Sequence, residues 1–176
     1  MLYIGLGILA LVIIFFIKKK TASTEVHAQF GLRESTHKIL STDLGEKTSR
    51  VRLSRMGING IADAVFQAIS GKEIVVGEFK SRKHRGVVKL YEFYQITLYM
   101  GHLQMDYPGH TIKGCLAYAD AKVQIVFDLQ LYEALLGLRS EYWESAKSKR
   151  AVNRTPLHKR VKVNSLNGGI KFSARL

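Results

Sequence analysis

A proline-free segment at residues 86–107 lies between groups of short apolar segments, and this order limits the possible folds. Apolar residues cover much of its surface as a helix, and Pro108-Gly109 predicts where that helix ends. The segments with strand-like patterns are 50–56, 58–69 and 73–80 before it, and 111–118 and 122–127 after it. Strands followed by a crossover helix and further strands indicate an α/β fold, in which helices flank a mixed β-sheet.

A helix is also predicted at each end of this domain. Thr24 is a residue type that caps helices, and the apolar pattern predicts a helix from there to about Leu40. Asp128 can cap a last helix that runs to about Lys149. The residues after it are rich in Lys and Arg and contain no Asp or Glu, which indicates a basic extension. The predicted divisions are therefore 1–20, 21–149 and 150–176.

The first of these divisions has the pattern of a membrane anchor. Residues 1–17 carry no charge, and Lys18, Lys19 and Lys20 follow directly. A cleaved signal peptide normally has its positive charge before the apolar segment, whereas here the charge comes after it. We expect a retained single-pass helix in an inner or plasma membrane, with the rest of the chain in the cytoplasm. A buried core helix and an unusual signal peptide are the alternatives.

The charge of the chain points to an anionic partner. The formal net charge is +13, which favours nucleic acid or anionic lipid. Cys115 is the only cysteine, which excludes a disulfide framework and any site built on clustered cysteines. The predicted phosphate contacts are the basic residues of two clusters: Arg50, Arg52, Arg55, Arg82, Lys83 and Arg85.

Two carboxylates are expected to meet in the sheet. Residues 70–72 (Ser-Gly-Lys) predict a hairpin turn, which brings Asp63 on one strand near Glu78 on the next. Taken alone, Asp63 fits a solvated bulge and Glu78 fits an ordinary surface salt pair with Lys80. Together, the two carboxylates repel each other unless one is protonated or a cation lies between them. A hard divalent cation such as Mg²⁺ or Mn²⁺ suits oxygen ligands of this kind.

Further residues complete the chemistry of a hydrolase. Lys80 lies two residues after Glu78 and on the same face of the strand, where it can orient or help to deprotonate a water molecule. Gln95 and Tyr99 lie one turn apart on one face of the central helix. A metal ion, an activated water and a held phosphate together indicate hydrolysis of a phosphodiester bond.

Three motifs in this order resemble those of a known family. They are Gly60-x-x-Asp63, Glu78-x-Lys80 and Gln95-x-x-x-Tyr99. The sequence resembles the PD-(D/E)XK nuclease superfamily, and within it the RecB-type branch that includes the CRISPR-associated RecB-like exonucleases. The resemblance covers about residues 24–130, and it implies a restriction-endonuclease-like fold that reaches about residue 149.

The resemblance also implies roles for individual residues. Asp63 and Glu78 would be metal ligands, with the backbone carbonyl of Phe79 as a further ligand. Lys80 would be the catalytic lysine, and Gln95 and Tyr99 would position the substrate or the surroundings of that lysine.

The sequence departs from the branch in several respects. Many members carry a further His or Glu ligand upstream, and His27 is the best positional candidate here, followed by Glu34. The alternative for His27 is a surface or helix-packing position. The four cysteines of the iron–sulfur cluster that several members hold are absent, so no such cluster is expected. A helicase is also absent from the given sequence, and a membrane anchor directly before the nuclease domain is not typical of the branch.

The function expected from these features is that of a membrane-anchored deoxyribonuclease that requires Mg²⁺ or Mn²⁺. One alternative is a catalytically silent domain that binds nucleic acid at the membrane. Another is a structural membrane protein whose basic face contacts anionic lipid. The choice between exonuclease and endonuclease, between DNA and RNA, and between strand polarities stays open, as do the pathway and any protein partners.

Overall fold

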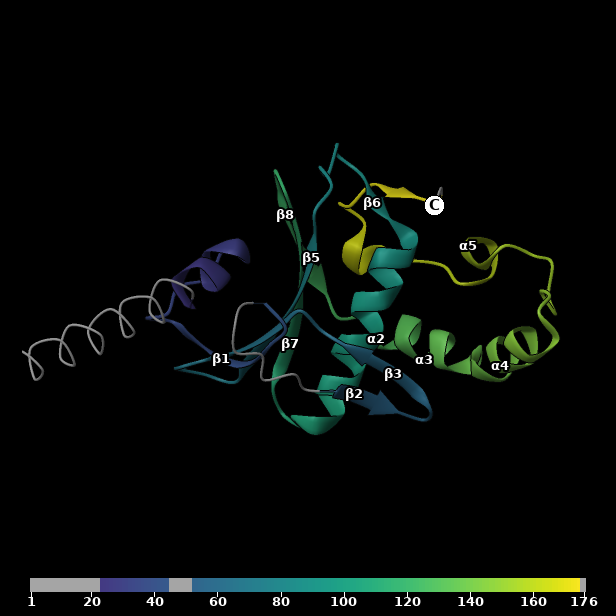
Figure 1. Ribbon diagram of the computed structural model, residues 1–176, viewed down its shortest axis with the longest axis horizontal. Helices are drawn as coiled ribbons and strands as arrows, with labels where there is room; N and C mark the ends of the chain where they lie inside the picture. Colours follow the sequence, from purple (N-terminus) through teal and green to yellow (C-terminus); the bar gives the residue numbers. More distant parts are fainter. Residues whose placement is uncertain (1–22, 45–51, 175–176) are drawn as a thin grey trace, which may run out of the picture.

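The computed structural model describes residues 23–44 and 52–174, and their centre is a five-stranded mixed sheet (Figure 1). In spatial order its strands are β1 (His37–Thr42), β4 (Ala64–Ala68), β5 (Glu73–Lys80), β7 (Thr111–Tyr118) and β8 (Lys122–Val126). Only β5 and β7 run parallel, and all other neighbours are antiparallel. The predicted α/β fold with a mixed sheet is confirmed.

Helices cover both faces of this sheet. The parallel strands β5 and β7 need a crossover connection, which is supplied by β6 (Val88–Lys89) and by α2 (Leu90–Asp106). Helix α2 buries Phe93, Ile96 and Met100 in the larger core cluster on one face of the sheet. A shorter helix at residues 23–29 covers the other face, where Phe30 and Phe66 centre a second cluster (Figure 1).

The N-terminal part of the domain differs from its prediction. A helix from Thr24 to Leu40 is wrong, because the helix ends at residue 29 and β1 begins at His37. Gly31 ends it with a φ of +73°, a left-handed conformation that glycine adopts without strain. The residues that follow pair with β4 in the sheet. Long-range pairing therefore overrides the local helical pattern.

The one strand predicted within residues 58–69, at 60–69, is divided between two strands in the structure. β3 (Ile58–Ile61) forms a separate two-stranded hairpin with β2 (Arg52–Arg55), whereas β4 belongs to the main sheet. The chain changes direction at Ala62 and Asp63, so Asp63 lies at the junction of the two sheets.

The C-terminal part of the structure packs on the same core. Asp128 caps α3 (Leu129–Gly137) as predicted, because its side chain accepts a hydrogen bond from the Leu131 N–H. The helix expected to reach Lys149 is broken at Leu138, where α4 (Arg139–Ser148) begins. The later elements are α5 (Leu157–Arg160), η1 (Ser165–Asn167) and β9 (Phe172–Ser173).

The segment predicted as a basic extension holds part of the core. β9 pairs in parallel with β6, and the ring of Phe172 lies 4.8 Å from that of Phe93 on α2. Val161 is buried, and its carbonyl accepts a hydrogen bond from the Tyr94 hydroxyl at 3.0 Å. Residues after 149 therefore contribute to the core that packs on α2.

The predicted membrane anchor at residues 1–17 lies outside the described residues. Within 23–44 and 52–174, no helix has both the length and the apolar character needed to cross a bilayer. The anchor stays a prediction from the sequence.

Candidate active site

Asp63 occupies the position where β4 stops pairing with β5. The register of these strands ends at Ala64 opposite Gly77, so beyond this point β5 is not paired with β4. The Asp63 Oδ2 oxygen accepts the hydrogen bond of the Phe79 N–H at 2.6 Å. Because the N–H and C=O of one strand residue point to the same edge, the Phe79 carbonyl also faces this side of β5.

Glu78 is the most buried member of the site, with 6% of its surface exposed. Its Oε1 oxygen accepts hydrogen bonds from Lys80 Nζ at 3.1 Å and from Gln95 Nε2 at 2.8 Å. Its Oε2 oxygen is buried and forms no hydrogen bond of normal length among the described residues, although the nearby backbone N–H of Asp63 lowers the pKa of Glu78 against the effect of burial. A buried carboxylate oxygen without a partner is costly, and such an atom calls for a ligand or a water.

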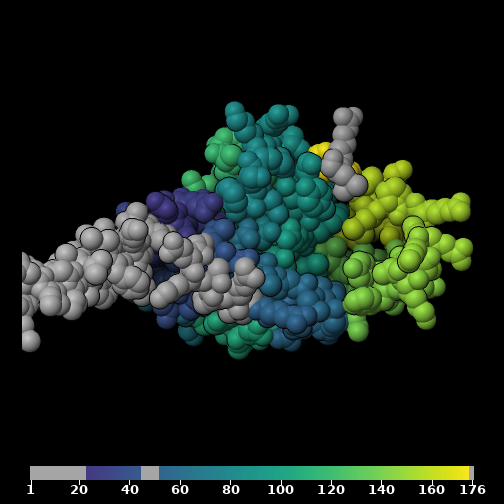
Figure 2. All heavy atoms as spheres, viewed as in Figure 1, coloured from purple at the N-terminus to yellow at the C-terminus, as the bar shows by residue number. Residues whose placement is uncertain are grey.

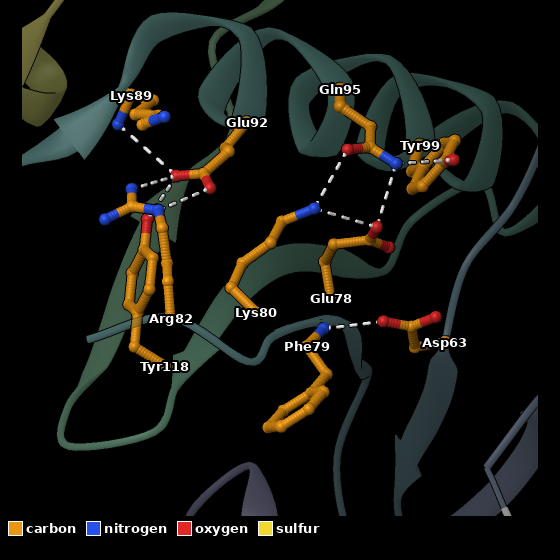
Figure 3. Close-up of polar contacts among 10 residues, drawn as sticks. All are labelled: Asp63, Glu78, Phe79, Lys80, Arg82, Lys89, Glu92, Gln95, Tyr99 and Tyr118. Atoms are coloured by element: carbon orange, nitrogen blue, oxygen red, sulfur yellow. Dashed lines mark hydrogen bonds and ion pairs between the residues drawn. The ribbon is translucent and has the colours of Figure 1, made fainter. Parts of the chain in front are cut away.

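Lys80 is held from two sides, as Figure 3 shows. Strand alternation places it on the same face as Glu78, toward α2. Its Nζ donates to Glu78 Oε1 and also to Gln95 Oε1, both at 3.1 Å. The ammonium group is therefore fixed in position by one residue of its own strand and one of the crossover helix.

Gln95 and Tyr99 connect this arrangement to α2 and β3. The Gln95 amide donates to Glu78 and, at 3.0 Å, to the Tyr99 hydroxyl, while its oxygen accepts from Lys80. The Tyr99 ring lies against Gly60 of β3. The structure thus brings together all five residues predicted as catalytic and the glycine of the first motif.

The electrostatics of the two carboxylates are unfavourable in the absence of a cation. Burial raises the pKa of Glu78, and the negative charge of Asp63 raises it further. Burial also raises the pKa of Asp63, and nearby Asp43 adds to this against the opposing effects of Phe79 N–H and Lys80. Asp43 was not expected from the sequence. It belongs to no motif, and only the pairing of β1 with β4 brings it to Asp63.

The donor set fits a divalent cation with a small number of protein ligands. Asp63, Glu78 and the Phe79 carbonyl offer oxygen atoms, which Mg²⁺ and Mn²⁺ prefer. Within the described ranges, no three His, Cys, Asp or Glu side chains form a metal-binding group. Mg²⁺ usually retains several waters and takes one or two carboxylates, so a pair of carboxylates is compatible with it.

His27 is not brought to this pair. It lies under the opposite face of the sheet, where its ring contacts that of Phe66 at 5.2 Å. Its Nδ1 and Nε2 atoms lie 2.8 and 2.9 Å from the carbonyl oxygens of Ser23 and His37. Both nitrogens face backbone carbonyls, so the structure gives His27 a packing position rather than a ligand position. Glu34 lies in the connection that follows the same helix.

The predicted phosphate contacts fall into different surroundings. Arg50 lies outside the described residues, and Arg52, Lys83 and Arg85 are exposed. Arg55 is paired with Asp106 at 3.0 Å. Arg82 is half-buried and paired with a buried carboxylate, as described next, so several of the predicted basic residues are already engaged within the protein.

Arg82 forms an ion pair with Glu92, a residue of α2 that is only 1% exposed. Two guanidinium nitrogens contact the carboxylate at 3.0 and 2.6 Å, and the Tyr118 hydroxyl donates to it at 2.8 Å (Figure 3). Burial alone would raise the pKa of Glu92, but hydrogen bonds from Arg82 and Tyr118 hold it below its ordinary value. Arg82 thus fastens the residues that follow β5 to α2, and its contact with phosphate stays a prediction.

Comparisons with known proteins do not identify a family. No protein-family model matches the sequence, and no curated protein matches it. Among solved structures, the crystal structure of SSO0001 aligns with a TM-score of 0.37 at 20% sequence identity. The alignment covers 68% of this chain and 58% of that one, so this chain matches little more than half of that protein. A similarity of this size indicates neither a shared fold nor a shared function.

Proposed function

We propose that this protein is a metal-dependent nuclease of the PD-(D/E)XK type that hydrolyses phosphodiester bonds in DNA. The observation that carries the proposal is the state of Glu78, whose buried Oε2 forms no hydrogen bond of normal length in the described part of the chain and whose pKa is raised by burial and by Asp63. A divalent cation between the two carboxylates would satisfy the free oxygen and remove the repulsion. The mixed sheet, with α2 between its parallel strands, agrees with the restriction-endonuclease-like fold that the motifs imply.

The ligands in this proposal are the carboxylates of Asp63 and Glu78 and the backbone carbonyl of Phe79. When bound, Mg²⁺ or Mn²⁺ would supply a Lewis acid that stabilises charge on the phosphate and lowers the pKa of the attacking water. The Phe79 N–H keeps the Asp63 carboxylate in place at 2.6 Å.

Lys80 has one hydrogen-bond donor left for the reaction. An ammonium group has three donors, and two of them are directed to Glu78 and Gln95. The third can reach the attacking water or a phosphate oxygen, where charge develops in the transition state. Gln95 acts as a positioning residue, because it holds both the lysine and the carboxylate.

The proposed setting is the cytoplasmic side of a membrane. It rests on the uncharged residues 1–17 and the three lysines that follow them. Fractionation of cells that express the full chain, followed by extraction with carbonate and with detergent, tests it. An anchored protein resists carbonate and is released by detergent, whereas release by carbonate would rule out the anchor.

The nuclease proposal is tested with the purified full chain and Mg²⁺ or Mn²⁺. Linear duplex, circular duplex and single-stranded DNA serve as substrates, so that exonuclease and endonuclease activity are separated. Lys80→Met should lower the cleavage rate by about 10²–10⁴-fold, the usual contribution of a positioned acid–base group. Lys72→Met is the matched control, because Lys72 is an exposed lysine that is not among the predicted phosphate contacts.

Two outcomes would contradict the nuclease proposal. One is that the wild-type chain cleaves no substrate with either metal ion. The other is that Lys80→Met and Asp63→Asn cleave as fast as the wild type. Salt-sensitive DNA binding without cleavage would instead favour the silent nucleic-acid-binding domain.

A further inference from the structure

A groove of about 730 Å³ lies beside the candidate active site. Its floor is α2, where Tyr91, Gln95 and Tyr99 follow one another at intervals of four residues and so share one face. The facing wall is α4, which contributes Arg139, Tyr142 and Trp143. These six residues define the α2–α4 groove. Because Gln95 also holds Glu78 and Lys80, the groove leads directly to the catalytic residues.

The aromatic side chains of the groove are more exposed than packing requires. Helix α4 has no buried residue, and its Tyr142 and Trp143 are 64% and 51% exposed. Their rings meet edge to face, with centroids 5.2 Å apart and planes at 73°, which leaves ring faces uncovered. Tyr91 on the facing helix is 45% exposed. Figure 2 shows α4 and the following chain, in light green to yellow, beside the blue β2–β3 hairpin.

The groove is also positively charged. In the described part of the chain no acidic residue pairs with Arg139, and its guanidinium lies beside Gly57 at the tip of the β2–β3 hairpin. Arg160 is different, because both of its terminal nitrogens contact Glu141 at 2.7 Å and so fix α5 to α4. The chain between these two helices is exposed and rich in Lys and Arg. Flat apolar rings next to cationic groups suit a ligand with flat bases and a phosphate backbone.

We propose that the α2–α4 groove binds unpaired nucleobases of a nucleic-acid strand. Trp143, Tyr142 and Tyr91 stack on the bases, and Arg139 contacts the phosphates. Paired bases in a duplex stack on one another, so the rings reach only bases that are unpaired. This inference rests on the proposed function, because it assigns the strand that the site would cleave. Single-stranded DNA and RNA share this chemistry, and the experiment separates them.

The only tryptophan of the chain provides a direct signal. The purified full chain is titrated in EDTA, where no cleavage occurs, with oligo-dT, oligo-U or a blunt duplex. Tryptophan fluorescence and the anisotropy of a labelled oligonucleotide are both recorded. We expect quenching of Trp143 by one or both single strands and none by the duplex. Quenching by oligo-dT supports DNA as the ligand of the groove. Quenching by oligo-U alone supports the groove as a binding site for RNA.

Substitutions then test the rings themselves. Tyr142→Ala combined with Trp143→Ala should weaken binding of the single strand by about 10-fold or more, since base stacking contributes about 1–3 kcal/mol per base. Both residues are exposed, so the double variant should fold. Leu129→Ala is the matched control, because Leu129 is an exposed apolar residue (55%) that does not line the groove. This variant should bind the single strand with the affinity of the wild type.

The inference and the proposed function can fail separately. Quenching by the duplex as strong as by single strands, or wild-type affinity in the double variant, overturns the groove assignment. Binding of the dye ANS without a response to any oligonucleotide would mean a different apolar occupant and also overturns it. If the protein cleaves DNA in a way that depends on Lys80 but its tryptophan is not quenched, the proposed nuclease function stands and the groove assignment fails. If single strands quench the tryptophan but no substrate is cleaved, the proposed nuclease function fails and the groove assignment is supported.

Discussion

The ring of Tyr99 occupies the space in which a side chain on Gly60 would begin. A Cβ atom at residue 60 would lie 2.9 Å from the Tyr99 hydroxyl oxygen and closer still to its ring. The position of the Tyr99 ring in the third motif therefore requires glycine at residue 60 in the first motif. The contact lets β3 approach α2, so that the chain can place Asp63 at the end of β5.

Gly60→Ala should consequently displace Tyr99 and, through it, Gln95. We expect a loss of about 1–3 kcal/mol in the free energy of unfolding, as for other overpacked sites, together with slower cleavage. Chemical denaturation measures the first and the cleavage assay measures the second. Gly137→Ala is the control, because nothing lies within 4 Å of a Cβ there. Tyr99→Ala in the same chain should restore part of the lost stability but not the activity, and an additive result would argue against the contact.

Asp63→Asn should stabilise the protein when no metal is present. The pKa of Asp63 is raised, so the folded state loses stability as the pH rises from the ordinary value of 3.8 through the folded value. Above the folded pKa the destabilisation is complete, and the neutral amide of Asn removes it. Each kcal/mol relieved should raise the Tm by about 2–4 °C in a chain of this size. Thermal unfolding in EDTA measures the difference in Tm between Asp63→Asn and the wild type. This difference should shrink when the pH is below 3.8, the ordinary pKa of Asp63.

The same variant should respond less to metal ions. Mn²⁺ at about 100 times its Kd should stabilise the wild type by about 2.7 kcal/mol, because only the folded state offers the site. Asp63→Asn loses a charged ligand and should show a much smaller rise in Tm. An equal rise in both proteins would place the metal elsewhere. Asp106→Asn is the control, since Asp106 is an exposed carboxylate paired with Arg55.

Arg82→Gln should affect folding more than binding of DNA. It leaves Glu92, which is 1% exposed, without its ion-pair partner, and such a loss costs about 3 kcal/mol or more. The pKa of Glu92 is lowered in the folded state, so this stabilisation is present above the ordinary value of 4.5 and is lost as the pH falls through the folded value. The difference between wild type and Arg82→Gln in urea unfolding should therefore narrow at low pH. Arg85→Gln, an exposed neighbour, should leave stability unchanged.

Asn167 offers a test of the C-terminal packing. Its side chain is buried, and it accepts from the Val126 N–H at 3.0 Å and donates to the Val126 carbonyl at 2.9 Å. Asn167→Ala leaves both backbone groups without a partner and should cost about 1–3 kcal/mol. Asn153→Ala, at an exposed turn, should cost less than about 0.5 kcal/mol. Equal stability of the two variants would mean that the contacts of Asn167 with Val126 do not stabilise the fold.

The arrangement of the candidate site could be predicted from the sequence because it depends on local periodicity. Two residues separated by one on a strand share a face, as Glu78 and Lys80 do, and two residues separated by a helical turn do the same, as Gln95 and Tyr99 do. The hairpin at residues 70–72 then fixed which strands were neighbours. The α2 helix and the cap at Asp128 carry strong local signals for the same reason.

The remaining features depend on contacts between distant residues. β1 forms where a helix was predicted, because its hydrogen bonds come from β4. The sequence predicts Arg82 as a phosphate contact and gives no sign of its ion pair with Glu92, because Glu92 lies on another element. The same holds for Asp43, which belongs to no motif, and for His27, whose ring faces two backbone carbonyls. None of these contacts has a signature within a short window of sequence.

The pairing of β9 with β6 has a consequence for how the protein is made. β6 leads directly into α2, whereas Phe172, which packs on Phe93, is translated long after it. The motif residues therefore leave the ribosome before the residues that complete the support of their helix. Because a domain generally folds as a unit, the support of α2 is complete only after this late segment has docked, and a chain synthesised only as far as α4 would carry every motif residue without the β6–β9 pairing.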